Sequence, residues 1–385
     1  MRGLRFGILT LGLAGIAACA EPALIREGPY WVQVITGSEA LTPSARLRII
    51  SRGAVTLSGV GPNELWYSLK VRVKASTEAA ARQLAKAFGA RVGRQGGGYT
   101  NLIIHRGDGL ADLQVKIPRT APEATITTTE GALDFSDLDG SVKAETGGGN
   151  IKADRIRGNV VARTAGGDIT LGTVEGSARC ATAGGKITAN LVRGEATFET
   201  GGGDVFAQEV GGLVRASTMA GSIRIRRAGS AVIASTGGGP IDVGQAQGWV
   251  TAKNSAGPVQ VGSAQGVSCE SGGGGVQLAN ISGGVRVSTA IGSIFASLLA
   301  GKPMADSFLS TGSGDITVFI PSNVGVTIRA QNEMADSIRR IVSDFPGIRV
   351  RVEGGQVVAE GPVNGGGPVL RISGTGGTIS IKRQQ

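Results

Sequence analysis

The chain has 385 residues, and its 39 lysines and arginines against 29 aspartates and glutamates give a formal net charge of +10. Glycine is abundant, with 65 residues, whereas aromatic residues make up only 4% of the chain. There is one histidine, and the three cysteines include no CxxC pair. These counts exclude a disulfide framework and a cysteine–histidine metal cluster, and they leave any histidine-dependent catalysis to a single residue.

The first 20 residues are typical of an export signal. Two arginines precede an apolar run from Ile8 to Ala18, which is too short to span a bilayer. Two endings fit the segment: a small-x-small cleavage site before Glu21, or a bacterial lipobox at 16–19 in which Cys19 is lipidated and begins the mature protein. We favour lipid attachment at Cys19, because cysteine is unusual at an ordinary cleavage site. The alternative is a soluble exported protein that loses Cys19.

Residues 21–127 form the second part, which we expect to be a small β-rich domain with one helix. Alternating or apolar runs predict strands at Tyr30–Ile35, Leu47–Ile50, Ala54–Ser58, Leu65–Lys74, Thr100–Ile104 and Ala111–Ile117. The helix is expected to start at a Ser76 or Thr77 cap with Glu78 in its first turn. Its apolar face would carry Ala80, Leu84, Ala87 and Phe88, and Gly89 would close it.

A strict repeat organises residues 128–330. Glycines stand 18 residues apart at 131, 149, 167, 185, 203, 221, 239 and 257, and the series continues at 274, 292 and 314 with steps of 17, 18 and 22. A threonine, with Asn254 and Ser271 as exceptions, precedes each glycine by three residues, and an aliphatic residue follows it by two. A fixed short period of this kind indicates a stacked repeat architecture.

Each repeat predicts two short strands. Numbered from its threonine, a unit has apolar residues at positions 6 and 8, at 11, and at 15 and 17, and no run keeps a helical period. The glycine at position 4 would permit positive φ at a sharp corner, where a side chain would clash. The threonine would point inward and bond corner backbone. We therefore predict an all-β fold, a β-solenoid of about eleven 18-residue coils and roughly 50 Å in length.

Residues 331–385 are expected to cap the solenoid. The period is lost in Gln331–Gly355, where a short helix is expected around Met334–Ile341. A last coil then returns, since Leu370, Ile372, Gly377, Ile379 and Ile381 reproduce positions 15, 17, 4, 6 and 8. Capping units of atypical sequence are expected at both ends of a repeat domain.

Nothing in the repeats indicates catalysis, a cofactor or a metal. The carboxylates at position 5, such as Asp168 and Asp204, are too scattered for a calcium ladder. The glycine runs lack the Lys-Ser/Thr and the helix of a phosphate-binding loop. His105 is interpreted as an ordinary strand residue. Cys180 and Cys269 would lie about 24 Å apart, too far for a disulfide, and are expected in the core.

The net charge of the chain and three outward aromatic residues indicate which kinds of partner to expect. Loss of the two signal arginines leaves +8 (10 − 2), and export argues against a nucleic-acid partner. An envelope polymer or another surface protein is expected instead, with membrane association through Cys19 if it is lipidated. Phe206, Trp249 and Phe295 are predicted to face solvent and are the candidate recognition residues, although they lie on different coils.

The repeat motifs carry a family resemblance. TGGGNI at 146–151, TAGGDI at 164–169, TGGGDV at 200–205 and TGSGDI at 311–316 are followed by Ser-Asp-Phe-Pro at 343–346, Asn-Gly-Gly-Gly-Pro at 364–368 and Gly-Thr-Gly-Gly-Thr-Ile at 374–379. Over about residues 125–385 the chain resembles the bacterial putative-adhesin family of β-strand-repeat proteins. The resemblance implies a β-solenoid on an exported, envelope-associated protein with no catalytic residues to carry over.

These features together predict a non-enzymatic protein of the cell envelope with a structural or adhesive surface role. Its expected location is the outer membrane or the periplasmic face of the envelope if it is a lipoprotein, and the periplasm or the medium otherwise. An exported polysaccharide-binding or polysaccharide-cleaving protein is one alternative. A periplasmic scaffold or sensory module that holds another protein is the other.

Overall fold

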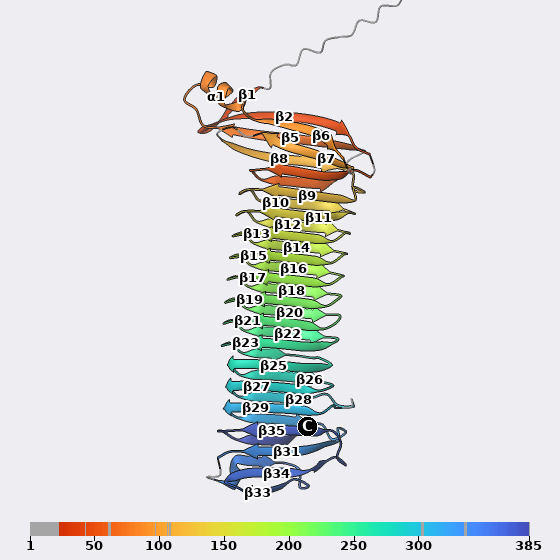
Figure 1. The fold of residues 1–385 in the computed structure, drawn as a ribbon, viewed down its shortest axis with the longest axis vertical. Coiled ribbons are helices and arrows are strands. Elements are labelled where there is room, and N and C mark those ends of the chain that lie inside the picture. Colours follow the sequence, from red (N-terminus) through yellow and green to blue (C-terminus); the bar gives the residue numbers. More distant parts are fainter. Residues whose placement is uncertain are drawn as a thin grey trace, which may run out of the picture.

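The computed structural model describes residues 23–384, except 43, 61–62, 97, 106, 108, 302–303 and 335–336. The export segment and Cys19 therefore lie outside the described residues. The described chain forms a straight rod of stacked coils, with the N-terminal strands and α1 at one end and β33 and β34 at the other (Figure 1). This is the predicted all-β solenoid of about eleven coils with a small mixed β region before it.

Two parallel sheets build the middle of the rod, and each coil adds one strand to each. Sheet A contains β10 (Leu133–Leu138), β12 (Ile151–Ile156), β14 (Ile169–Val174), β16 (Ile187–Val192), β18 (Val205–Val210), β20 (Ile223–Ala228), β22 (Ile241–Ala246), β24 (Val259–Val261), β26 (Val276–Ile281), β28 (Ile294–Leu298) and β30 (Ile316–Ile320). Sheet B contains β9 (Glu123–Thr128), β11 (Ser141–Thr146), β13 (Val160–Thr164), β15 (Ala178–Thr182), β17 (Ala196–Thr200), β19 (Val214–Thr218), β21 (Val232–Thr236), β23 (Trp249–Asn254), β25 (Gly266–Gly273), β27 (Val285–Ile291) and β29 (Ser307–Ser313).

The pairing register follows the 18-residue period, so residues at the same repeat position stack on one another in successive coils. Ile151 pairs with Ile169, and Ile169 pairs with Ile187, each directly above the last. Many inward positions of sheet B hold alanine, for example Ala162, and they are fully buried because the two sheets lie close together. Phe135 and Phe198 are the largest fully buried side chains of the described chain. The apolar positions of each repeat thus form one thin core that continues from coil to coil.

The threonine of each coil ties neighbouring coils together at the corner. The Thr200 hydroxyl donates to the Gly185 carbonyl of the preceding coil at 2.8 Å and accepts from the backbone N–H of Gly203 at 3.2 Å. The same pair of bonds recurs at Thr146, Thr164, Thr182, Thr218 and Thr236. Each buried hydroxyl therefore satisfies one carbonyl and one N–H that the corner would otherwise leave unpaired.

The glycine of position 4 is needed for close approach rather than for positive φ. From 131 to 274 none of these glycines has φ in the left-handed region, and only Gly292, Gly314 and Gly377 do, at 144°, 142° and 90°. A Cβ at Gly203 would instead lie 2.1 Å from the carbonyl oxygen of Gly185. The expected clash is confirmed, but the expected conformation is wrong for most coils: the glycine is required because corners stack backbone on backbone.

The N-terminal end continues both sheets, with one coil inserted out of chain order. β3 (Arg46–Ser51) and β4 (Val55–Gly59) pair in parallel with β9 and β10 on one side. On the other side they pair with β7 (Tyr99–His105) and β8 (Leu110–Ile117), which come later in the chain. The Thr128 hydroxyl donates to the Gly53 carbonyl at 3.0 Å, so the corner ladder extends into this coil.

Antiparallel strands finish that end of the rod. β5 (Glu64–Val73), β2 (Tyr30–Ala40) and β1 (Leu24–Glu27) extend sheet A beyond β8, and β6 (Gly89–Gln95) extends sheet B beyond β7. The six predicted strands of this region are present as β2, β3, β4, β5, β7 and β8, whereas β1 and β6 were not predicted. Antiparallel strands stop the parallel stacking of coils at the end.

The predicted helix is present as α1 (Glu78–Ala85), and the Thr77 hydroxyl caps it by accepting from the N–H of Ala80 at 3.3 Å. Its apolar face differs from the prediction. Ala81, Ala85 and Phe88 are buried, Leu84 is half-buried, and Ala80 and Ala87 are exposed. Gly89 does not close the helix but begins β6, so the buried face was predicted about one residue out of phase.

At the C-terminal end the last strands of the chain are inserted between earlier ones. β35 (Val369–Gly374) pairs in parallel with β29 on one side and with β31 (Val326–Asn332) on the other. β36 (Ile379–Arg383) lies likewise between β30 and β32 (Ile341–Ser343). The predicted returning coil is confirmed, and Figure 1 marks the C-terminus beside β35 rather than at the end of the rod.

β34 (Gln356–Val363) and β33 (Arg349–Glu353) add antiparallel strands beyond β31 and form the last layer of sheet B. The helix expected around Met334–Ile341 is a single 3₁₀ turn, η1 (Ile338–Arg340). The segment 331–355, in which the period is lost, therefore holds the end of β31, the turn η1, and the strands β32 and β33.

Candidate functional site

The three outward aromatics do not come together. Phe206 lies half-buried on sheet A between Thr188 and Arg224, and Phe295 lies on the same sheet five coils away, at about 24 Å. The Phe295 and Phe319 rings are in contact, with 4.9 Å between centroids and a tilt of 44° between their planes. Trp249 is on sheet B, so it faces a different side of the rod.

Trp249 has a structural reason for its position. Its indole is 44% exposed and lies across the next coil, where a Cβ at Gly266 would stand 2.5 Å from indole Cε2. A Cβ at Gly284, one coil further, would stand 3.2 Å from indole Cη2. The two glycines make room for the ring, which covers the backbone of both coils.

The carboxylates at position 5 act as caps for backbone amides. Asp168 Oδ1 accepts from the N–H of Lys186 at 2.9 Å, and Asp204 Oδ1 accepts from the N–H of Ser222 at 2.7 Å. The bonds from Ser222 lower the pKa of Asp204. Within the described residues there is no group of three or more His, Cys, Asp or Glu side chains placed to hold a metal ion.

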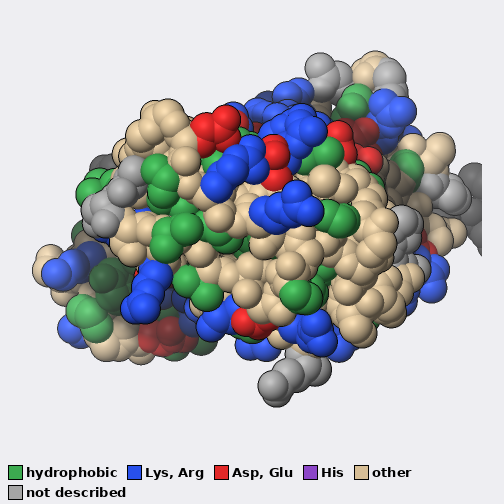
Figure 2. All heavy atoms as spheres, turned by 90° about the horizontal axis from the view of Figure 1, so that it is seen from below, with side chains coloured by type: hydrophobic (Ala, Val, Ile, Leu, Met, Phe, Trp, Pro, Cys, Tyr) green, Lys and Arg blue, Asp and Glu red, His purple; other side chains and the backbone are tan. Residues whose placement is uncertain are grey.

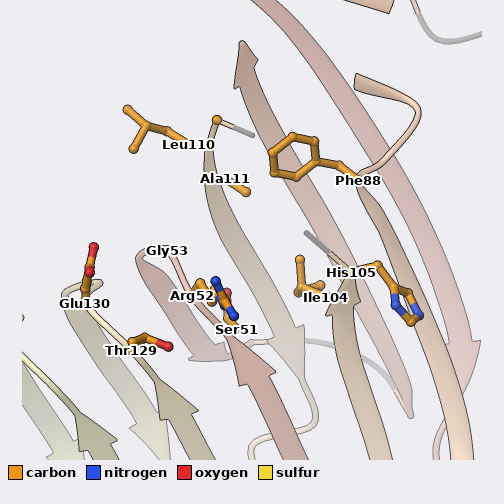
Figure 3. Close-up of a pocket in the computed structure, with 11 residues that line it drawn as sticks. Ser51, Arg52, Gly53, Phe88, Ile104, His105, Leu110, Ala111, Thr129 and Glu130 are labelled. Carbon is orange, nitrogen blue, oxygen red and sulfur yellow. The ribbon is translucent and has the colours of Figure 1, made fainter. Parts of the chain in front are cut away.

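A cavity of about 130 Å³ lies where the N-terminal region meets the first coils (Figure 3). Ser51, His105 and Glu130 line it, but Figure 3 places His105 and Glu130 on opposite sides. The buried Ser51 hydroxyl has no hydrogen-bond partner, so it is not bonded to His105. The three residues do not form a nucleophile–base–acid arrangement, and His105 occupies the last position of β7.

Cys180 and Cys269 are buried and free, on strands five coils apart in sheet B. Burial raises the pKa of each thiol to about 12. Both are core residues, as the repeat positions predicted.

An open groove runs along the corner between the two sheets. Position 2 holds small residues such as Gly147, Ala165 and Ala183, and the groove is closed at one end by Met219, which is 74% exposed. Glu145, Arg163 and Glu199 stand on its edge and alternate in sign. This groove therefore presents no dominant charge.

The C-terminal part of sheet B carries a basic hollow that the period does not reveal. A hollow of about 300 Å³ is lined by Phe308, Arg329, Ala330, Gln331, Arg351, Glu353, Val358, Glu360, Arg371, Ile372 and Ser373. These residues come from β29, β35, β31, β34 and β33, which lie side by side in that order. Figure 2, which looks onto this end of the rod, shows lysine and arginine side chains interspersed with acidic and hydrophobic ones.

One row of outward side chains crosses this hollow. Arg286 of β27 pairs with Phe308, Phe308 pairs with Arg371, and Arg371 pairs with Arg329. Phe308 is 41% exposed. The neighbouring outward row is polar, with Ser288, Ser310, Ser373 and Gln331 in register. We call these two rows, from Arg286 to Gln331, the basic face.

The arginines of this region differ in their partners. Arg351 bonds Glu353 at 2.9 Å, which raises its pKa, and its Nη2 lies 3.5 Å from Glu360. Arg329 lies 3.9 Å from Glu360. Across the described residues, no carboxylate stands within salt-bridge distance of Arg286 or Arg371. By contrast, Arg224 of β20 is paired with Asp242 at 3.3 Å.

Comparison with known proteins finds only solved structures of low sequence identity and low TM-score. No protein-family model matches the chain, and no curated protein matches it. Solved structures similar to it include a "putative cell adhesion protein" from Clostridium sporogenes, with 10% identity, 91% of this chain and 100% of that chain covered, and a TM-score of 0.18. A "putative adhesin" from Bacteroides fragilis has 10% identity, 91% and 97% coverage and a TM-score of 0.23.

A "putative lipid binding protein" from Parabacteroides distasonis is similar at 10% identity, with 91% and 97% coverage and a TM-score of 0.22. At these TM-scores the assignment of the solenoid rests on the two sheets themselves. In the part of the chain that the structure describes, no helix is long and apolar enough to cross a membrane.

Proposed function

We propose that this protein is an exported, non-enzymatic β-solenoid of the cell envelope with an adhesive or structural surface role. In this proposal residues 1–20 direct export, Cys19 carries the lipid, residues 21–127 form the membrane-proximal part, 128–330 form the rod, and 331–385 close it. The export signal, the repeat and the short turns support the proposal together.

The observation that carries the proposal is the placement of the two ends of the rod. The chain enters at the N-terminal end, beside β1 and β2, and the basic face lies toward the opposite end (Figure 1). About eleven coils separate them, a distance of roughly 50 Å. A tether at Cys19 would hold the N-terminal end near a membrane and present the basic face away from it.

The first experiment is the intact mass of the protein purified from its native membrane fraction, with its N-terminus mapped. Diacylated or triacylated Cys19 is the expected result. A free N-terminus at Glu21 would contradict the tether and leave a soluble exported protein. A Cys19→Ser variant should leave the membrane fraction, whereas Cys180→Ser should remain in it, because Cys180 is buried in the rod.

A polysaccharide-binding role is the second candidate, and the exposed Phe308 beside unpaired arginines favours it. Aromatic rings and hydrogen-bonding side chains on a flat face suit sugars. Polysaccharide cleavage has less support, because no described loop near the basic face encloses a substrate and none of its residues has a nucleophile–base geometry.

A further inference from the structure

We propose that the basic face binds the chain of an acidic polysaccharide, with Arg286 and Arg371 holding carboxylate or sulfate groups and Phe308 packing against a sugar ring. The inference deepens the proposed surface role and rests on it, because export places the face among envelope and extracellular polymers. The site lies on one defined part of sheet B, the adjacent strands β27, β29, β35 and β31.

Charge is the first argument. Five arginines, at 286, 329, 349, 351 and 371, face two glutamates, at 353 and 360, across the five outermost strand pairings of sheet B. Arg351 pairs with Glu353 and Glu360, and Arg329 pairs with Glu360, but Arg286 and Arg371 have no described carboxylate in range. An exposed guanidinium without an internal partner favours an external anion, and its planar fork matches carboxylate or sulfate.

Spacing is the second argument. Arg286, Phe308, Arg371 and Arg329 stand in register on adjacent strands, at steps of about 4.8 Å. The two unpaired arginines flank the ring of Phe308 on either side. An anionic polymer laid along the rod would therefore meet a cation, an aromatic ring and a second cation in sequence.

The polar row is the third argument, and it distinguishes a sugar from other anions. Ser288, Ser310 and Ser373 align beside the arginine row, and Gln331 donates to Ser373 Oγ at 3.4 Å. Hydroxyl and amide groups at each step supply donors and acceptors for sugar hydroxyls. A simple counterion site would need neither this row nor an exposed phenylalanine.

The test measures binding of polygalacturonate and heparin to the full chain at low and moderate salt, with neutral dextran as the comparison polymer. We expect both acidic polymers to bind, dextran not to bind, and affinity to fall with salt. Arg371→Gln should weaken binding about tenfold and Phe308→Ala about fivefold, since each removes one contact of the row. Thermal unfolding of each variant is recorded to show that it is folded.

Arg215→Gln is the matched control. Arg215 occupies the same outward row of sheet B on β19, between Thr197 and Ile233, and is exposed. Its loss should change affinity less than twofold. Equal losses in Arg215→Gln and Arg371→Gln would show non-specific charge attraction and overturn the site.

Two other outcomes would contradict binding of an acidic polysaccharide at the basic face. Absence of binding to both acidic polymers at low salt would overturn the proposal. Binding of poly-glutamate as tightly as polygalacturonate, unaffected by Phe308→Ala, would assign the face to acidic peptides instead. Neither result bears on lipid attachment at Cys19, so the surface role and this site fail independently.

Discussion

The side-chain amide of Asn332 donates to the carbonyl of Gly377 at 3.0 Å, although Gly377 comes 45 residues later in the chain. The bond has the same place in its corner as the bond from Thr200 to Gly185. Asn332 therefore occupies the threonine position of a coil stacked beyond the coil of Gly377. The equivalent corner positions stack from Thr311 through Gly374, which has no side chain to bond, to Asn332, against the order of the chain.

Asn332 is fully buried, and its Oδ1 also accepts from the N–H of Met334 at 3.0 Å. Asn332→Leu keeps the volume but leaves the Met334 N–H unpaired and the Gly377 carbonyl with only the longer bond from Arg340 Nη1, at 3.5 Å. We expect a loss of about 1–3 kcal/mol in the stability of the C-terminal coils. Hydrogen exchange should quicken in β31, β35 and β36 and stay unchanged in β16 and β18, because coils contact only their neighbours.

The control for Asn332 is threonine, the residue that other coils use at this position. Asn332→Thr should retain the bond to Gly377 and lose less stability than Asn332→Leu. Equal exchange rates in the two variants would show that the bond to Gly377 does not stabilise the inserted coil.

Gly203→Val tests the close stacking of corners. Any Cβ at Gly203 meets the Gly185 carbonyl oxygen at 2.1 Å, so two coils must separate to admit it. We expect the free energy of unfolding to fall by at least about 3 kcal/mol, measured by urea unfolding followed by circular dichroism.

The neighbouring Gly202 is the matched control for Gly203. A Cβ at Gly202 has its nearest contact at 3.8 Å, the Gly184 carbonyl oxygen, and the residue is exposed. Gly202→Ala should change stability by less than about 1 kcal/mol. If Gly203→Ala were as mild as Gly202→Ala, close approach would not be the reason for the 18-residue glycine series.

Thr200→Val removes one hydroxyl and keeps the shape of the side chain. The Gly185 carbonyl and the Gly203 N–H then lose their partner at a buried corner. We expect a loss of about 1–3 kcal/mol. Thr200→Ser retains the hydroxyl and should be milder in the same unfolding experiment; a serine variant less stable than the valine variant would assign the role of Thr200 to its methyl group.

The two buried thiols predict both reactivity and an alkaline effect on stability. Burial raises the pKa of Cys180 and Cys269 from an ordinary value of 9.0 to about 12, which stabilises the neutral thiol in the fold. Their contribution is complete below pH 9 and is lost as pH rises toward 12. A thiol reagent at pH 8 should label neither residue in the native protein and both after unfolding.

Labelling of either thiol in the native protein at a rate near that of the unfolded chain would contradict its core position. A Cys180→Ala, Cys269→Ala double variant should lose less stability than wild type between pH 9 and pH 11, since neither position can then ionise on unfolding.

The sequence alone determined the repeat architecture, because a coil can bury its apolar face only against another coil in the same register. The residue types at Thr164, Gly167 and Ile169 recur every 18 residues, and this recurrence predicts the place of each residue in its coil. Inward alternation, the buried threonines and the core cysteines could all be predicted, since these depend on local period and on stacking of neighbours in the chain. The sequence did not determine which residues of α1 face the core, because Ala80 and Ala81 are chemically alike and only packing distinguishes them.

Only the tertiary structure decided the order of coils at the two ends and the surface that depends on it. Phe308, Arg371 and Arg329 are separated by 63 and 42 residues, and they meet because β35 enters between β29 and β31. Parallel pairing there satisfies backbone hydrogen bonds equally well for strands near or far along the chain. No local pattern distinguishes an inserted coil from a terminal one, so the basic face follows from long-range pairing and not from the period.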